Sequence, residues 1–131
     1  MLHLTAEELI HIANRATGTT VGVRDAGLLE AAAARPQTSV FGQDAYPDLV
    51  TKAAALTQSI GGNHALVDGN ERLGLGALIA FLGINGHTLT WSNDEAYDFI
   101  VAIADGSMTE VDEIAARLRP AAEGNTSADP R

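Results

Sequence analysis

An apolar run of twelve residues, Leu73 to Ile84, limits the folds open to this chain more than any other segment. A helix that is apolar on every side has no face to leave in water, so it belongs at the centre of a domain. The run is too short to cross a bilayer, and its three glycines suggest close helix packing. We therefore expect a buried central helix that has Asn70 as its N-cap and ends at Asn85-Gly86.

Helix-start signals occur along the rest of the chain. Thr5 with Glu8, and Ser92 with Glu95, have the spacing of capping boxes, and aspartates can cap two further helices. The expected helices run from about 5 to 17, 28 to 34, 48 to 60, 70 to 84, 92 to 104 and 109 to 118. The sequence thus predicts an all-α compact bundle of about six helices, with at most a short strand pair.

The domain organisation follows from these segments. One domain is expected over residues 1–119, and a flexible C-terminal tail over residues 120–131. Residues 35–47 are long enough to suggest an ordered loop, with Phe41 and Tyr46 as anchors. Arg35 and Lys52 lie beside this loop, and a solvated position is expected for both.

The composition excludes several classes of function. The formal net charge is −9 with only 8 Lys and Arg residues, whereas nucleic-acid binding needs a basic surface. There is no cysteine, so disulfides and thiolate metal sites are excluded. The first residues lack the pattern of a signal peptide, and the remaining histidines, at 3, 11 and 87, lack the spacing of zinc ligands. A cytoplasmic protein that contacts neither nucleic acid nor membrane is expected.

The segment 63–74 carries the candidate chemistry, because it leads into a helix N-terminus, where free N–H groups bind anions. His64 is a base that can take a proton from a hydroxyl near neutral pH. Asp68 offers oxygen ligands to Mg²⁺, and Arg72 has a planar charged group suited to phosphate oxygens. Chemistry on a phosphate is therefore the leading hypothesis for this segment.

Gly69 and Asn70 complete the candidate site. Gly69 allows the backbone to approach a phosphate closely, and Asn70 can donate its amide N–H to phosphate while starting the helix. The loop lacks the Lys-Ser/Thr ending of a P-loop. The structural alternative is an ordinary turn and helix cap, with Arg72 paired to Glu71 or Asp68 at the surface.

The pattern His-x-x-x-Asp-Gly-Asn-x-Arg, formed by His64, Asp68, Gly69, Asn70 and Arg72, resembles the core motif of the Fic/Doc superfamily. More narrowly, the chain resembles the Doc (death-on-curing) toxins. The resemblance covers most of the chain, and the other segments that carry it are Gly22–Glu30, Ala34–Gln37, Tyr46-Pro47, Lys52–Leu56, Asn63-His64, Phe81-Leu82 and Asn85-Gly86.

This resemblance implies a small helical bundle that transfers a phosphoryl or AMP group from ATP to a target hydroxyl. Doc proteins transfer the γ-phosphate to a threonine of elongation factor Tu, which stops translation, and so act as protein kinases. By this resemblance His64 would be the general base, Asp68 the Mg²⁺ or orienting carboxylate, and Asn70 and Arg72 phosphate holders, with Arg72 also catalytic. ATP and Mg²⁺ are the implied cofactors. The implied partners are a Phd-like antitoxin, whose C-terminal segment folds onto the toxin, and elongation factor Tu as target.

The chain departs from the family pattern at three positions. Ala65 replaces a proline and Leu66 a phenylalanine, and Leu66 can still anchor the loop in the core. Glu71 replaces the lysine of Doc proteins at the phosphate-binding site. Two like charges about 4 Å apart repel by roughly 4 kcal/mol at an effective dielectric constant near 20. Either Glu71 points away, or it recruits a further Mg²⁺, or the chain is inactive, with Glu71 as an inactivating substitution.

Two alternative functions stay open on the sequence. One is AMP transfer, the activity of Fic proteins, although Leu75 stands where their motif has a second arginine. The other is a catalytically silent module that keeps the fold and binds an antitoxin. The only Glu-Gly pair, Glu123-Gly124, has Arg119 where the inhibitory helix of self-inhibited Fic proteins has a hydroxyl, so inhibition by another chain is expected.

Overall fold

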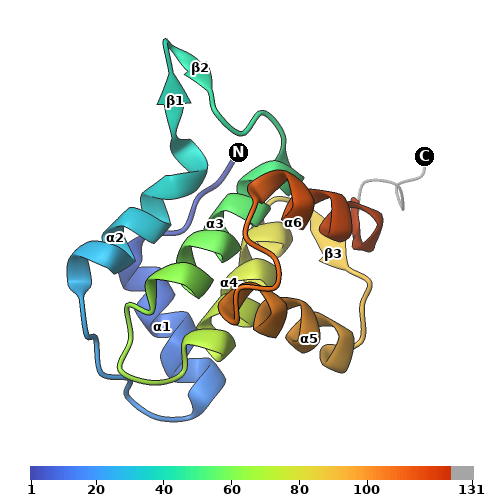
Figure 1. The fold of residues 1–131 in the computed structure, drawn as a ribbon. Coiled ribbons are helices and arrows are strands. Elements are labelled where there is room, and N and C mark those ends of the chain that lie inside the picture. The colour runs from blue at the N-terminus through green and yellow to red at the C-terminus, as the bar shows by residue number, and fades with distance from the viewer. Residues whose placement is uncertain (125–131) are drawn as a thin grey trace.

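The computed structural model describes residues 1–124, which form a bundle of six α-helices with two short antiparallel strand pairs (Figure 1). The helices are α1 (Ala6–Thr17), α2 (Ala26–Ala34), α3 (Leu49–Asn63), α4 (Asn70–Ile84), α5 (Asn93–Ala104) and α6 (Val111–Leu118). The strands are β1 (Ser39–Val40), β2 (Gln43–Asp44), β3 (His87–Leu89) and β4 (Ala122–Gly124), and single 3₁₀ turns lie at Arg35–Gln37 and Arg119–Ala121. The predicted all-α class is confirmed, with one strand pair more than expected.

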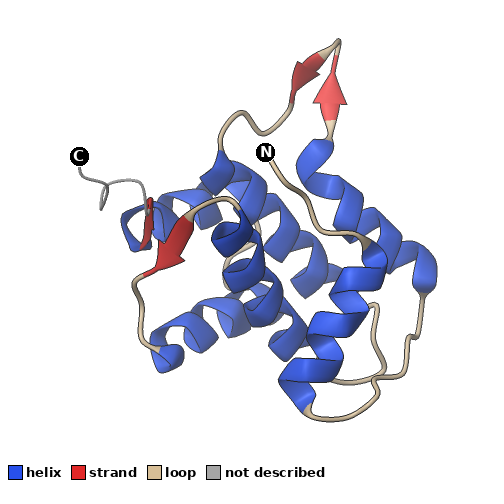
Figure 2. Cartoon of the chain, turned by 180° about the vertical axis from the view of Figure 1, so that it is seen from behind, coloured by secondary structure: helices blue, strands red, loops and turns tan. Residues whose placement is uncertain are grey.

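Helix α4 is the centre of the bundle, as its apolar sequence predicts, and it packs against α1, α3 and α5 (Figure 2). Its side chains with at most 1% of their surface exposed are Leu73, Ala77, Leu78, Phe81 and Leu82. A Cβ atom at Gly76 would lie 2.7 Å from Ile12 Cγ2, and one at Gly74 would lie 3.1 Å from Ile100 Cγ2. These glycines therefore let neighbouring helices approach α4 closely. Among the described residues, α4 included, no helix has the length and hydrophobicity that a membrane crossing requires.

The predicted helix starts are mostly confirmed. The side chain of Thr5 accepts a hydrogen bond from the Glu8 N–H at 3.1 Å, and the Glu8 carboxylate accepts one from the Thr5 N–H at 2.9 Å. Asp48 caps α3 in the same way. Helix α3 continues to Asn63, however, past the expected end at Gly61. A Cβ atom at Gly61 would lie 2.7 Å from Ile103 Cγ2, so this glycine permits close packing of α3 on α5 rather than ending the helix.

The loop between α2 and α3 contains a hairpin that the sequence did not predict. Its tip has positive φ at Phe41 (51°) and Gly42 (78°). Phe41 is fully exposed, so the expectation that it anchors this loop is wrong. Tyr46 does act as an anchor, because its hydroxyl accepts a hydrogen bond from Arg35 Nε at 2.8 Å. Lys52 is buried rather than solvated, and its Nζ lies 3.2 Å from Asp44 Oδ2.

The start of the predicted C-terminal tail is part of the fold. Strand β4 pairs with β3, which follows α4, and Ala121 and Ala122 are buried. The ordered domain therefore extends beyond residue 119, because apolar side chains at 121 and 122 complete the core over β3. The rest of the predicted tail, residues 125–131, lies outside the described residues.

Candidate functional site

The motif loop joins the C-terminus of α3 to the N-terminus of α4, and residues with left-handed backbone stand at both ends of it. His64 follows α3 with φ 50° and ψ 54°, and Gly69 precedes α4 with φ 87°. Few non-glycine residues adopt positive φ, and they are found where the surrounding structure holds them. Gly69 is the N-cap of α4, so the prediction that Asn70 is the N-cap is wrong.

Asn70 instead holds the loop together from inside. Its Oδ1 accepts a hydrogen bond from the Leu66 N–H at 3.1 Å, and its Nδ2 donates one to the Leu66 carbonyl at 3.0 Å. Leu66 is 1% exposed and Ala65 is buried as well, which confirms the expectation that Leu66 anchors the loop in the core. The side-chain amide of Asn70 therefore satisfies backbone groups that burial would otherwise leave without partners.

The connector between α1 and α2 holds the loop from outside. Arg24 Nε donates to the His64 carbonyl and Arg24 Nη2 to the Asn63 carbonyl, both at 2.8 Å. The backbone N–H groups of Arg24 and Asp25 both donate to the Ala65 carbonyl. Sequence reasoning missed Arg24, because a contact across 40 residues leaves no local pattern. Its place in one of the segments that match the Doc toxins was the available signal.

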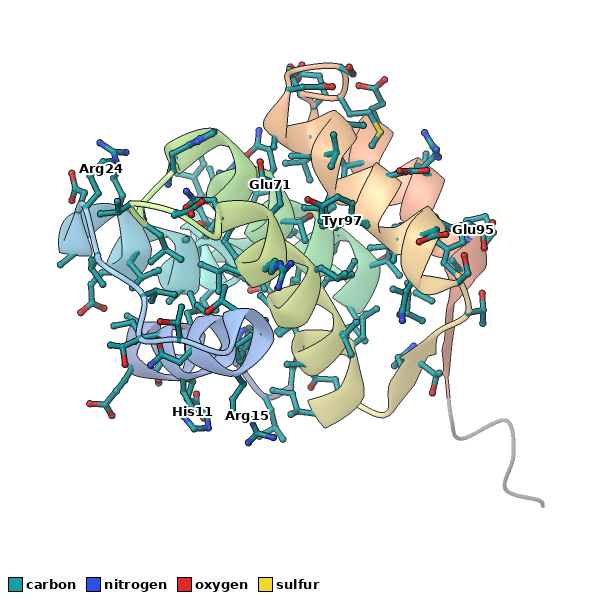
Figure 3. The ribbon with its side chains drawn as sticks, turned by 90° about the horizontal axis from the view of Figure 1, so that it is seen from below. His11, Arg15, Arg24, Glu71, Glu95 and Tyr97 are labelled. Atoms are coloured by element: carbon teal, nitrogen blue, oxygen red, sulfur yellow. The ribbon has the colours of Figure 1, made fainter. Side chains whose placement is uncertain are left out.

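A pocket of about 580 Å³, here called the Asp68 pocket, lies between this loop, the end of α1 and the start of α4. Four predicted site residues line it: Asp68, Gly69, Glu71 and Arg72. The other lining residues are Thr17, Thr19, Thr20, Val21, Gly22, Val67 and Tyr97. Figure 3 labels Glu71 and Tyr97, which come from neighbouring helices, α4 and α5. Glu71 thus lies at the same cavity as Asp68 and Arg72.

The charges of the Asp68 pocket are not paired with one another. Among the described residues, Arg72 forms no ion pair with Asp68 or Glu71, so the structural alternative of a surface pair is not what the fold contains. Arg72 Nη1 donates to the Ala16 carbonyl at 3.3 Å, which ties this guanidinium to the end of α1. Within residues 1–124 no side chain caps α4, and its first helical hydrogen bond runs from the Leu73 N–H to the Gly69 carbonyl. The helix therefore presents its positive end to the pocket.

His64 lies in a different pocket from the other site residues. This pocket, here called the His64 pocket, has a volume of about 350 Å³, and its lining residues include Arg35, Asn63 and Thr109. Among the described residues, neither ring nitrogen of His64 has a hydrogen-bond partner, and the residue is exposed. The base of the motif therefore lines a pocket that shares no lining residue with the pocket of the carboxylates and Arg72.

The donor set suits a Mg²⁺ ion that is bound largely through phosphate. No cluster of three or more His, Cys, Asp or Glu side chains able to hold a metal occurs within residues 1–124. Asp68 Oδ1 accepts the Gly69 N–H at 2.9 Å, and Asp68 is exposed to the pocket. Mg²⁺ is commonly held by one or two carboxylates together with substrate phosphates and water. Asp68 fits that role, and Glu71 is a second carboxylate in the same pocket.

Comparison with known proteins agrees with this architecture. The model of the Fic/DOC family matches residues 3–82, which include the whole motif loop and α4 as far as Leu82. The chain is also 48% identical over 123 residues to a curated protein of Mycolicibacterium smegmatis named Toxin Doc. That alignment covers 88% of this chain and 90% of the relative.

Proposed function

Because the chain belongs to the Fic/Doc family, we propose that it is a Doc-like toxin that transfers the γ-phosphate of ATP to a threonine hydroxyl of elongation factor Tu. The observation that carries the proposal is the Asp68 pocket, where a free helix N-terminus, a cation and a carboxylate surround one cavity. A phosphate chain needs this combination of backbone donors, permanent positive charge and metal-binding oxygen. The name of the relative supports the toxin assignment and an antitoxin as partner.

Each site residue has a task in this proposal. Arg72 and the N–H groups at the start of α4 hold the phosphates, while Asp68 offers oxygen to a metal ion. Mg²⁺, when bound, would neutralise phosphate charge and bridge phosphate oxygens. His64, with no partner on its ring, accepts the proton of the attacking hydroxyl. His64 lines the other pocket, so in this step the acceptor threonine would approach along the His64 pocket. Its hydroxyl would have to reach the γ-phosphate while it is within hydrogen-bond distance of His64.

Glu71 favours a second candidate function, a catalytically silent module that keeps the fold and binds an antitoxin. Its carboxylate lines the pocket that the proposal assigns to phosphate. Unless a metal ion lies between them, it repels a nucleotide bound there. Removing this charge is therefore the most informative single change in the chain.

The test combines two variants with labelled ATP. The chain, Glu71→Lys and Glu71→Lys with His64→Asn are incubated with Mg²⁺, γ-labelled ATP and elongation factor Tu. Asparagine suits position 64 because it tolerates the left-handed backbone there. We expect label on the factor with Glu71→Lys, and none when His64 is also replaced.

The outcomes separate the candidate functions. Label with the unsubstituted chain as well would mean that Glu71 is tolerated, as a ligand of a further Mg²⁺ would be. Label from α-labelled but not from γ-labelled ATP would establish AMP transfer instead. No label from either, with Glu71→Lys folded, would refute both transfer activities and leave the silent module.

A further inference from the structure

The His64 pocket contains one permanent charge, and the function proposed above gives that charge no task. Arg35 lines this pocket at the point where α2 ends and the loop to α3 begins. Among the described residues that line the pocket, His64 is the other ionisable side chain, and none is a carboxylate. The guanidinium of Arg35 therefore has no counter-ion from the walls of the His64 pocket.

The base of the β1–β2 hairpin holds Arg35 in place. Figure 1 shows this hairpin standing out from the bundle; Arg35 precedes it in the chain and Tyr46 follows it. Arg35 Nε donates to the Tyr46 hydroxyl at 2.8 Å, and Arg35 Cζ lies 5.5 Å from the centre of the Tyr46 ring. Tyr46 thus engages one nitrogen and one face of the guanidinium, which limits how that group can turn.

The two terminal nitrogens of Arg35 are left for a ligand. Within residues 1–124, Nη1 and Nη2 have no hydrogen-bond or ion-pair partner, and the residue is half-buried. The amide donors of the same pocket are already used. Gln58 Nε2 donates to the Thr109 carbonyl at 2.9 Å. Asn63 Nδ2 donates to Ser59 Oγ at 3.1 Å. A carboxylate binds to the fork of a guanidinium through two parallel hydrogen bonds, and Arg35 has the pair of charged donors that this requires.

We propose that Arg35 binds a carboxylate of the acceptor protein and thereby helps to select which threonine is phosphorylated. This inference rests on the proposed function, in which the acceptor threonine approaches along the His64 pocket. The phosphates of the nucleotide are assigned to the Asp68 pocket, which shares no lining residue with the His64 pocket. The anion that reaches Arg35 is therefore a side chain of the acceptor.

The net charge of the chain makes this contact selective. At −9 the chain repels acidic surfaces in general, so a carboxylate of the acceptor is favoured only where it meets Arg35. An acceptor segment with Asp or Glu at that place gains affinity. A segment with Lys or Arg there brings two cations together and is rejected.

Steady-state phosphorylation of elongation factor Tu tests the inference, in whichever form of the chain transfers phosphate, unsubstituted or Glu71→Lys. Arg35→Gln and Arg35→Lys are compared with two controls in that form. Tyr46→Phe removes the hydroxyl that Arg35 Nε binds but keeps the charge of Arg35. Arg117→Gln removes an exposed cation of α6 that lines neither pocket.

We expect Arg35→Gln to raise the KM for elongation factor Tu about tenfold, as the loss of a charge-assisted contact would. Its kcat should change less than about twofold, because the contact is made equally in the ground state and the transition state. Arg35→Lys should keep part of the affinity, because it keeps the charge but not the fork. Tyr46→Phe and Arg117→Gln should leave this KM within about twofold of the parent value. The KM for ATP should be the same in all of these proteins, since Arg35 does not line the Asp68 pocket.

A double-mutant cycle identifies the partner carboxylate and does not depend on the folding of one variant. Mass spectrometry locates the phosphorylated threonine, and each Asp or Glu near it in the acceptor is replaced in turn by Asn or Gln. One of these replacements should raise the KM of the parent chain about tenfold and have no further effect in Arg35→Gln.

Several results would overturn the inference. Additive effects of Arg35→Gln and every acceptor replacement would mean that Arg35 does not contact an acceptor carboxylate. Equal losses for Arg35→Gln and Tyr46→Phe would mean that Arg35 only holds the hairpin, and a lower kcat at unchanged KM would mean that it acts on the transferred phosphate. Unchanged transfer by Arg35→Gln would refute this inference alone. Absence of transfer by every form would refute the proposed function and this inference with it.

Discussion

Replacing Asn70 by alanine should destabilise the fold, because its side chain makes both hydrogen bonds to the backbone of Leu66. Each such bond contributes about 1 kcal/mol net, and a buried N–H or carbonyl left without a partner costs about 1–3 kcal/mol. Leu66 is 1% exposed, so water reaches its backbone poorly. We therefore expect a loss of about 2–3 kcal/mol in the free energy of unfolding.

Urea denaturation at pH 7 measures this loss as a lower midpoint at an unchanged slope. Asn93→Ala is the matched control, because Asn93 is the first residue of α5 just as Asn70 is the first residue of α4. Asn93 is exposed, and its replacement should change the free energy of unfolding by less than about 0.5 kcal/mol. If Asn70→Ala were no more destabilising than Asn93→Ala yet abolished ATP binding, Asn70 would act on phosphate and the loop argument would be refuted.

Two further predictions concern α3. Gly61→Ala should lower the free energy of unfolding by about 1–3 kcal/mol, because it forces a methyl group against Ile103 of α5. A Cβ atom at Gly62 would have no neighbour within 4 Å, so Gly62→Ala should raise the free energy of unfolding by up to about 1 kcal/mol. Equal melting temperatures of the two variants would contradict this packing. The backbone N–H of Thr51 holds the pKa of Asp48 in the folded protein below its ordinary value of 3.8. The ionised carboxylate therefore stabilises the fold fully above pH 3.8, and this stabilisation is lost as the pH falls through the lowered pKa of the folded state. In urea at pH 7, Asp48→Asn should therefore have a lower free energy of unfolding than the parent, and this difference should become smaller towards pH 2. A difference that stays constant with pH would count against the charge of Asp48 as the cause.

The helices could be predicted from sequence because their signals are local. The capping boxes at Thr5 and Ser92 each require side chains three residues apart, and the structure contains both. The short strands could not be predicted in this way. A hairpin whose tip places Phe41 at positive φ has none of the usual Asn-Gly signal, and β4 is a strand only because β3 lies beside it.

The candidate site was predictable as a set of residues but not as an arrangement. The motif identified Asp68, Glu71 and Arg72, which the fold does bring to one pocket. It gave no indication that His64 would line a different pocket, since that depends on a left-handed turn after α3. Nor did it reveal that the amide of Asn70 is engaged with backbone, because adjacency in sequence does not say which way a side chain turns.

The attachment of the motif loop to Arg24 gives the site an opening equilibrium of its own. Its outer hydrogen bonds join the exposed residues 22–25 to residues 63–67, of which Ala65 and Leu66 are buried, and neither segment belongs to a helix interior. Such a pair can separate while α3 and α4 stay folded, so its amides should exchange with solvent sooner than those of the central helix. A molecule that binds only the closed loop would slow that exchange without touching the core. Ligand occupancy could therefore be followed at the Val67 amide, which donates to the Gly22 carbonyl at 2.9 Å.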